Sequence, residues 1–268
     1  VLMLVLPMHL VAAPEAERWS FWDHFNNTSR MEIDHSDWQN FLNLYVQEQT
    51  DGFNTVNYYA VTDADKQALK QYLKHLESTQ IRHFRKAEQK AFWINLYNAQ
   101  TINLILDHYP VASITDIDIS PGFFSNGPWK KKLLVVEGQA LSLDDIEHRI
   151  LRPIWNDPRI HYAVNCASIG CPNLNTQAFT GSNSEQLLEE SAQTFINHPR
   201  GVRIENGKLI LSKIYSWFSE DFGKNEPNII RHLQIYASDE LKAKLKTIKE
   251  VDHYEYDWSL NEIKPDQS

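Results

Sequence analysis

One segment of this sequence is richer in reactive side chains than the rest, and it contains two cysteines. Residues 160–172 read IHYAVNCASIGCP and place Cys166 and Cys171 around a short loop that contains a glycine. Upstream, Glu147 and His148 form an acid–imidazole pair. An imidazole that takes a thiol proton, oriented by a third group, makes the thiolate a nucleophile for an acyl carbon. The pattern therefore predicts a thiol-dependent hydrolase or acyl/amide transferase, with Cys166 as nucleophile and His148 as base.

The third group of such a site has several candidates. Glu147 falls in the middle of the apolar face of a predicted helix over residues 143–152, where a carboxylate must be paired or hydrogen-bonded. Asn95 and Asp257 are the other candidates for orienting the imidazole or stabilising an oxyanion. The candidate substrate-binding residues are Trp129, Asn98, Ser168 and His161.

Each of these residues also has a structural interpretation. Cys166 and Cys171 are close enough in sequence to form a local disulfide, which would make the protein a non-catalytic binding or scaffold module. A reversible disulfide between them would make it a redox sensor. Glu147 would then be a buried partner of an arginine or of backbone donors, and His148 a structural or surface histidine. Asn95 and Asn98 would tie their helix to loop backbone.

Hydrophobic spacing and capping residues predict the elements that position these side chains. Helices are expected from Ser36 to about Tyr45, from the Thr62–Asp65 capping box onward, and over residues 87–108, where the residue before Pro110 ends the helix. Capping boxes at Ser142…Asp145 and Ser182…Glu185 predict two more helices, which end at Pro153 and Pro199. Two further helices are expected over residues 228–237 and 238–250.

The expected strands are short. Residues 158–166 alternate like a central strand that ends at Cys166, and hairpins are expected around residues 137–138 and around Asn206–Gly207. Because helices dominate the N-terminal half and simple βαβ alternation is absent, the fold class is α+β. We expect a single globular domain whose helix-rich N-terminal half packs on a small, mainly antiparallel sheet with hairpins. The loop over residues 115–129, which includes Trp129, is expected to form a lid, a substrate rim or the cover of a core edge.

Composition limits the class of partner. The 268 residues carry a formal net charge of −9 and are 42% hydrophobic, which suits one sizeable core and disfavours nucleic acid as a partner. The apolar residues 1–13 resemble the core of a secretory signal, so residues 1–16 are predicted to be a signal segment and the protein to be periplasmic or secreted. Residues 17–34 are expected to be a linker, 35–262 the domain and 263–268 a tail. No integral membrane segment is expected once the signal is removed.

Several chemistries lack their sequence patterns. The chain has no Walker loop, no dinucleotide glycine fingerprint, no Gly-x-Ser-x-Gly elbow and no metal-ligand spacing, so we expect no cofactor and no metal. A small molecule or a peptide is the class of substrate that an acyl-directed thiol site would take.

Five blocks of this sequence resemble those of domain-of-unknown-function family 547 (DUF547), in the expected order across residues 35–262. The blocks are residues 92–99 (FWINLYNA), 141–148 (LSLDDIEH), 159–168 with Cys171-Pro172 (RIHYAVNCAS), 211–218 (LSKIYSWF) and 256–261 (YDWSLN). The resemblance implies an exported bacterial member and directs attention to both cysteines, the Glu-His pair, Asn95 and Asp257. A relation to papain-like or transglutaminase-like thiol enzymes would need a permuted or convergent site, because His148 precedes Cys166.

Overall fold

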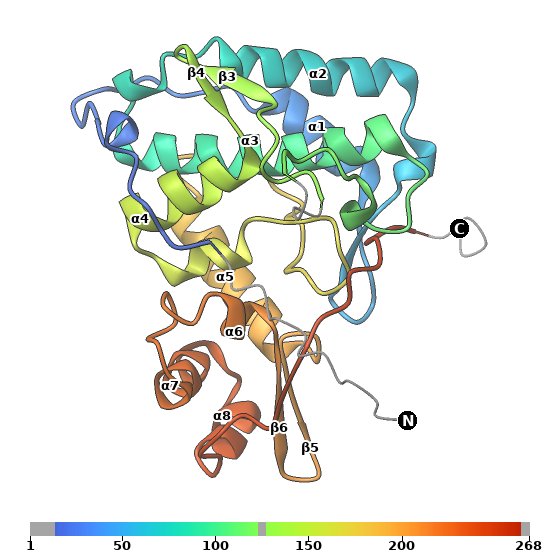
Figure 1. The fold of residues 1–268 in the computed structure, drawn as a ribbon, viewed down its shortest axis with the longest axis vertical. Helices are drawn as coiled ribbons and strands as arrows, with labels where there is room; N and C mark the ends of the chain where they lie inside the picture. Colours follow the sequence, from blue (N-terminus) through green and yellow to red (C-terminus); the bar gives the residue numbers. More distant parts are fainter. Residues whose placement is uncertain (1–13, 123–126, 264–268) are drawn as a thin grey trace.

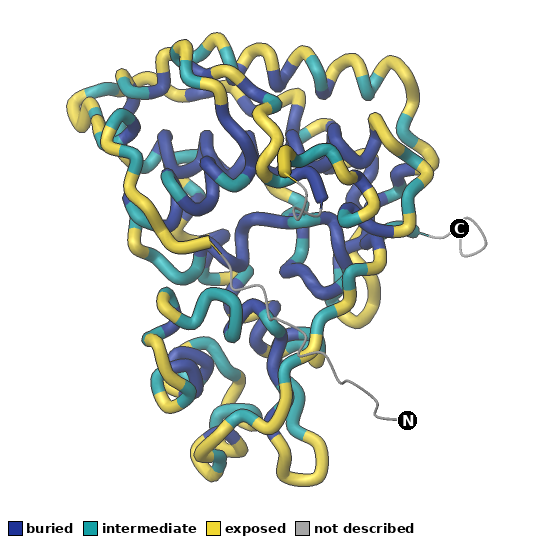
Figure 2. The backbone as a smooth tube through the Cα atoms, in the orientation of Figure 1, coloured by how far each residue is buried: buried dark blue, intermediate teal, exposed yellow. Residues whose placement is uncertain are grey.

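The computed structural model, which describes residues 14–122 and 127–263, is built around the long helix α3 (Lys86–His108). This helix is apolar nearly all round, and its side chains from Glu88 to Leu106 are buried. Figures 1 and 2 show it crossing the upper part of the molecule under the amphipathic helix α2 (Asp63–Glu77), whose outer side is exposed. The prediction of a buried helix over residues 87–108 is confirmed.

The remaining helices surround α3 or form the lower part of the molecule. The α-helices are α1 (Ser36–Tyr45), α4 (Arg152–Trp155), α5 (Ser184–Asn197), α6 (Ile214–Trp217), α7 (Glu226–Tyr236) and α8 (Asp239–Leu245). A π-helical segment, η5 (Asp145–Leu151), leads directly into α4. Short 3-10 helices are η1 (Ser20–Trp22), η2 (Tyr58–Ala60), η3 (Ile81–His83), η4 (Ile114–Asp116) and η6 (Pro158–Tyr162).

The strands are short and form small sheets. Antiparallel pairs join β1 (Val46–Glu48) to β2 (Asn54–Val56) and β3 (Leu134–Val136) to β4 (Gln139–Leu141). A three-stranded sheet has the order β5 (Val202–Glu205), β6 (Lys208–Ser212), β7 (His253–Glu255), with β5–β6 antiparallel and β6–β7 parallel. Asn206 and Gly207 both have positive φ, 52° and 79°, as the predicted hairpin turn requires. The protein is therefore α+β, as predicted.

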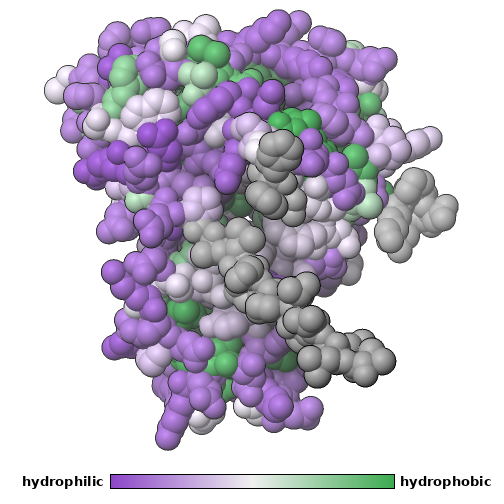
Figure 3. All heavy atoms as spheres, in the orientation of Figure 1, coloured by the Kyte–Doolittle hydropathy of each residue, from purple (hydrophilic) through white to green (hydrophobic). Residues whose placement is uncertain are grey.

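Two hydrophobic clusters stabilise the fold. The larger one contains α1, α2, α3 and the helix over residues 143–155, and the smaller one lies between α5, α7 and the inner face of the three-stranded sheet. In Figure 1 these clusters correspond to the broad upper part and the narrower lower part of the molecule. The face drawn in Figure 3 is mostly hydrophilic, with hydrophobic residues in small patches. Within residues 14–122 and 127–263, no helix has the length and apolar character needed to span a membrane.

Three predicted boundaries are wrong for identifiable reasons. The helix that begins after the confirmed Ser142–Asp145 capping box continues past Pro153 to Trp155. Proline removes one helical donor. The carbonyl of Arg149 instead accepts the backbone N–H of Trp19 at 3.0 Å, while the widened turn pairs Arg152 N–H with the Glu147 carbonyl.

The other two boundaries involve capping and length. The box before α5 is formed by Thr180 and Asn183, and not by Ser182 and Glu185, because the Glu185 carboxylate binds Lys90 and Arg159. The last helix, α8, ends at Leu245 and not at residue 250.

The structure describes the predicted linker and parts of the predicted signal segment and lid. The predicted linker, residues 17–34, contributes Trp22 and Ile33 to the larger core. Residues 1–13 of the predicted signal segment, residues 123–126 of the predicted lid and residues 264–268 of the predicted tail lie outside the described residues. Trp129, at the end of that loop, is half-buried and packs edge-on against Trp258 with ring centroids 5.7 Å apart.

Candidate functional site

The cysteines lie in an irregular loop, and the predicted strand over residues 158–166 is absent. Asp157 caps the N–H of Arg159, and Pro158 begins the 3-10 helix η6, so residues 158–162 are helical. Asp and Pro at these positions favour a helix start over an extended strand. Cys166 and Cys171 then form a disulfide, with Cα atoms 6.2 Å apart. We call residues 165–172 the cysteine loop.

Two asparagines of α3 fix the segments around this loop. Asn98 donates to the carbonyl of Ala163 at 2.8 Å and accepts the N–H of Asn165 at 2.8 Å. Asn95 makes the same pair of bonds with the N–H and carbonyl of Phe179. Both amides are buried. The interpretation that they tie the helix to loop backbone is confirmed, and the amide oxygen and nitrogen of Asn95 both bond to Phe179.

The cysteine loop pairs with the C-terminal segment, residues 256–261. The N–H of Ile169 binds the carbonyl of Ser259, and the N–H of Gly170 binds the carbonyl of Asp257, each at 2.8 Å. A Cβ on Gly170 would lie 2.8 Å from the Asp257 nitrogen, so only glycine permits this approach. The Asp257 side chain is exposed and accepts the N–H of Ser259 at 2.9 Å, as a turn-forming aspartate does.

Two hydroxyl groups contact the sulfur of Cys166. Sγ lies 2.9 Å from Oη of Tyr256 and 3.2 Å from Oγ of Ser168, and the two oxygens lie 2.9 Å apart. Burial raises the pKa of Tyr256 far above that of an ordinary phenol, so the residue stays a donor. The Ser168 hydroxyl lies beside the sulfur, and its role in substrate binding stays a prediction. Tyr256 was missed, although it begins the block at residues 256–261.

Glu147 and His148 lie in the π-helical segment η5, away from the cysteine loop's hydrogen bonds. His148 accepts a hydrogen bond on Nδ1 from Arg152 at 3.1 Å, while Nε2 lies 3.7 Å from Asp144. Burial lowers the pKa of His148 to about 4, because charging a desolvated imidazole is costly. Among the described residues, no hydrogen bond joins His148 to Cys166. The predicted pair of Cys166 and His148 is therefore not formed: Cys166 is bonded to Cys171, and His148 is hydrogen-bonded to Arg152.

His161 lies in the same group of polar side chains as Glu147 and His148. Its Nε2 lies 2.6 Å from Oδ2 of Asp221, its Nδ1 lies 3.8 Å from Oε1 of Glu147, and its ring stacks on Phe218 at 4.2 Å. Asp221 also accepts Nε–H of Arg152 at 2.6 Å. These two donors lower the pKa of Asp221 far below its usual range, against the effect of burial.

Asp221 and Arg152 were not predicted as site residues, because nothing near them in sequence marks them. Together with Glu147, His148 and His161 they form a buried polar network. Within the described chain, no group of three or more His, Cys, Asp or Glu side chains is arranged to hold a metal ion.

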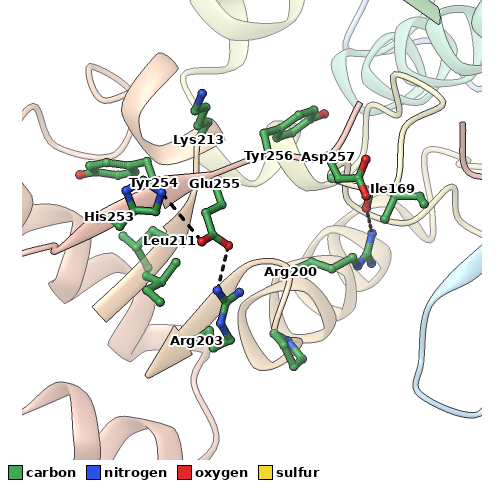
Figure 4. Close-up of a pocket in the computed structure, with 13 residues that line it drawn as sticks. Ile169, Arg200, Arg203, Leu211, Lys213, His253, Tyr254, Glu255, Tyr256 and Asp257 are labelled. Atoms are coloured by element: carbon green, nitrogen blue, oxygen red, sulfur yellow. Dashed lines mark hydrogen bonds and ion pairs between the residues drawn. The ribbon is translucent and has the colours of Figure 1, made fainter. Parts of the chain in front are cut away.

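A pocket of about 560 Å³ lies beside the cysteine loop (Figure 4). Ile169 and Gly170 of the loop form one part of its wall, and β6 and β7 with the residues that follow them form another. Its ionisable lining residues are Arg200, Arg203, Lys213, His253, Glu255 and Asp257. Arg203 is neutralised by Glu255 and Glu205 at 2.8 and 2.6 Å.

Arg200 differs from Arg203 because all of its partners are uncharged acceptors. Its guanidinium donates to the carbonyls of Ile169 and Cys171, to Asn173 and to His198. No carboxylate among the described residues lies within ion-pair distance of it, and burial lowers its pKa to about 10. Lys213 also has no ion pair in the described chain, and Figure 4 shows it pointing away from Glu255. Arg200 and Lys213 therefore line the pocket without a salt bridge to any described carboxylate, although Asp51 interacts with Arg200 at longer range.

The fold and the site together define an α+β protein in which a disulfide-closed loop forms part of the wall of a polar pocket. Residues 81–196 match the family described as "Protein of unknown function, DUF547". The match contains the Asn-bearing helix α3, the Glu147–His148 pair and both cysteines. Neither the curated proteins nor the solved structures include a significant match to this chain.

Proposed function

We propose that this protein is a binding module that holds a small anionic ligand in the pocket beside the cysteine loop. The observation that supports it is the Arg200 guanidinium, which is half-buried at the pocket wall without a carboxylate partner. A desolvated cation gains most from an anion that it can hydrogen-bond directly. A carboxylate or a phosphate group has this chemistry.

The state of Cys166 supports binding over thiol catalysis. A nucleophilic cysteine must be a thiolate with a base within hydrogen-bond reach. Here the sulfur is in a disulfide, and the imidazole of His148 is occupied by Arg152. The disulfide and the predicted export segment also support a location outside the cytoplasm, where disulfides persist.

Calorimetric titration with inorganic phosphate, and separately with citrate, tests the proposed pocket. Lys213→Met should weaken binding of the preferred anion, because it removes a cation that has no structural partner. Arg200→Gln should weaken binding about tenfold or more, since hydrogen bonds to charged groups are worth about 1.5–3 kcal/mol. Arg203→Gln is the matched control, because Glu205 and Glu255 already neutralise that cation.

Two results would contradict the proposal. One is the absence of saturable binding of both anions, or binding that the control variant weakens as much as the other two. The other is a reactive thiol at Cys166 in protein purified without reductant. If that thiol became less reactive in His148→Asn, the alternative thiol hydrolase would be supported.

A further inference from the structure

The two cysteines of the cysteine loop differ in exposure. Cys171 is 4% exposed, whereas Cys166 is only half-buried. An incoming thiolate must approach one sulfur of a disulfide and displace the other. In this loop an attacking group from solvent therefore meets Cys166, and Cys171 is the sulfur that leaves.

Hydrogen-bond donors are already in position for the leaving sulfur. The backbone N–H of Cys166 donates to Sγ of Cys171 at 2.9 Å. The Arg200 guanidinium donates a hydrogen bond to the Cys171 carbonyl, and within the described residues no carboxylate forms a salt bridge with this guanidinium. Backbone donors and cations both stabilise a thiolate, and a stabilised thiolate leaves faster.

The attacked sulfur has its own donors. Because a disulfide sulfur carries no proton, Tyr256 is the donor in its contact with Cys166 when the Ser168 hydroxyl donates to Tyr256. The same two hydroxyls would stabilise Cys166 when it is released as a thiolate. The hydrogen bonds that would stabilise the two thiolates of the reduced loop are therefore already present in the oxidised loop.

The loop does not depend on the disulfide for its shape. Asn165 accepts the N–H of Ala167 and donates to the carbonyl of Pro172, and Asn261 donates its N–H to the Ala167 carbonyl. Ala167 has a φ of 59°, a conformation that costs a non-glycine residue energy unless its surroundings hold it. These bonds keep the two cysteines near each other after the S–S bond opens, which makes closure reversible.

We propose that the Cys166–Cys171 disulfide is an exchange site that oxidises a dithiol. A thiolate of the dithiol attacks Sγ of Cys166, the S–S bond breaks, and its electron pair leaves on Sγ of Cys171. The second thiolate of the dithiol then attacks its own sulfur in the mixed disulfide and releases Cys166 as a thiolate. The substrate becomes a disulfide, the protein gains two electrons, and the new thiolates equilibrate with solvent protons. This activity goes beyond anion binding and does not require it.

The equilibrium is measured by incubating the full chain with mixtures of reduced and oxidised dithiothreitol, followed by acid quenching, alkylation and mass spectrometry. Tryptophan fluorescence in the same samples reports whether the protein stays folded. We expect reversible two-electron reduction of folded protein. Tyr256→Phe should shift the equilibrium toward the disulfide by about tenfold, the value of one hydrogen bond to a charged group. Tyr254→Phe, a neighbour whose hydroxyl does not contact sulfur, should leave it unchanged.

Single-cysteine variants test the order of attack. Cys171→Ser should leave a Cys166 thiol that reacts rapidly with an aromatic disulfide reagent, with an alkylation pKa below the ordinary value of about 8.5. Cys166→Ser should leave a Cys171 thiol that reacts at least about tenfold more slowly, as its burial requires. The proposal is overturned if reduction occurs only together with unfolding. It is equally overturned if Cys171 reacts faster, or if the two tyrosine variants behave alike.

Discussion

Nε2 of His161 lies 2.6 Å from Oδ2 of Asp221, although 60 residues separate them in the chain. The same carboxylate oxygen accepts Nε–H of Arg152 at 2.6 Å, and the side chain of Arg152 is only 4% exposed. One carboxylate therefore balances a buried guanidinium and orients a buried imidazole. This relationship makes Asp221 the residue on which the polar network beneath η5 depends.

Replacing Asp221 by asparagine should lower the free energy of unfolding by about 3–5 kcal/mol, because it leaves Arg152 buried without a counter-charge. The measurement is urea denaturation at pH 8. Asp144→Asn is the matched control on the same network. Burial and the nearby Glu147 raise the pKa of Asp144 to about 6, so its charged form is unfavourable in the folded state. This second substitution should cost nothing or stabilise slightly, and equal losses for both variants would contradict the assignment.

Stability should fall as the pH is lowered from about 6.5 to 4. Burial lowers the pKa values of His35, His148 and His232 to about 4, from 6.5. Within this window the unfolded chain binds more protons than the folded one, so acid favours unfolding. Asp144 acts in the opposite direction between about pH 6 and 4, since its folded pKa is raised, but it is one group against three.

The loss from these histidines should be on the order of several kcal/mol, because each pKa unit corresponds to about 1.4 kcal/mol. Urea denaturation at intervals between pH 7.5 and 4.5 measures it. His35→Gln, which removes one titrating ring, should flatten the curve in this window. A stability that stays constant from pH 6.5 to 4.5 would show that these rings accept protons in the folded state.

The double variant Cys166→Ala, Cys171→Ala should fold, with a free energy of unfolding lower by about 2 kcal/mol. The bridge closes only a short loop, and the entropy that a cross-link removes from the unfolded chain grows slowly with loop length. Backbone bonds to residues 256–261 hold the loop independently. Urea denaturation of the oxidised protein and the double variant measures the difference, and a variant unfolded in water would mean that the bridge is essential.

Gly170→Ala should displace the cysteine loop from residues 256–261. Its Cβ would meet the backbone nitrogen of Asp257 at 2.8 Å, and backbone atoms cannot move aside as a side chain can. Overpacking of this kind costs about 1–3 kcal/mol. Gly52→Ala is the control, because that glycine has positive φ but nothing within 4 Å, so it should show only a backbone cost of about 1 kcal/mol. Hydrogen exchange of the backbone amides in residues 256–261 measures the displacement. Exchange should become faster in Gly170→Ala and stay unchanged in Gly52→Ala.

Several features were determined by local sequence alone. The Thr62 N-cap, the Ser142–Asp145 capping box, the apolar surface of α3 and the Asn206–Gly207 turn each act within a few residues, so spacing predicted them correctly. The predicted resemblance to DUF547 is confirmed over residues 81–196, which contain three of the five blocks. Burial of Asn95 and Asn98 followed from their position on an apolar helix, and backbone bonding followed from burial.

Other features were decided by contacts between distant segments. The strand prediction for residues 158–166 failed because alternation of apolar residues cannot distinguish a strand from buried irregular backbone, whereas Asp157 and Pro158 begin a helical turn. Helix η5–α4 passes Pro153 because Trp19, far upstream, binds the carbonyl that proline leaves unpaired. Tyr256 reaches Cys166 across 90 residues, and Arg152 occupies His148, so the site depends on tertiary structure. Local sequence determines where helices and turns begin, but only the packed chain determines which polar groups must satisfy one another.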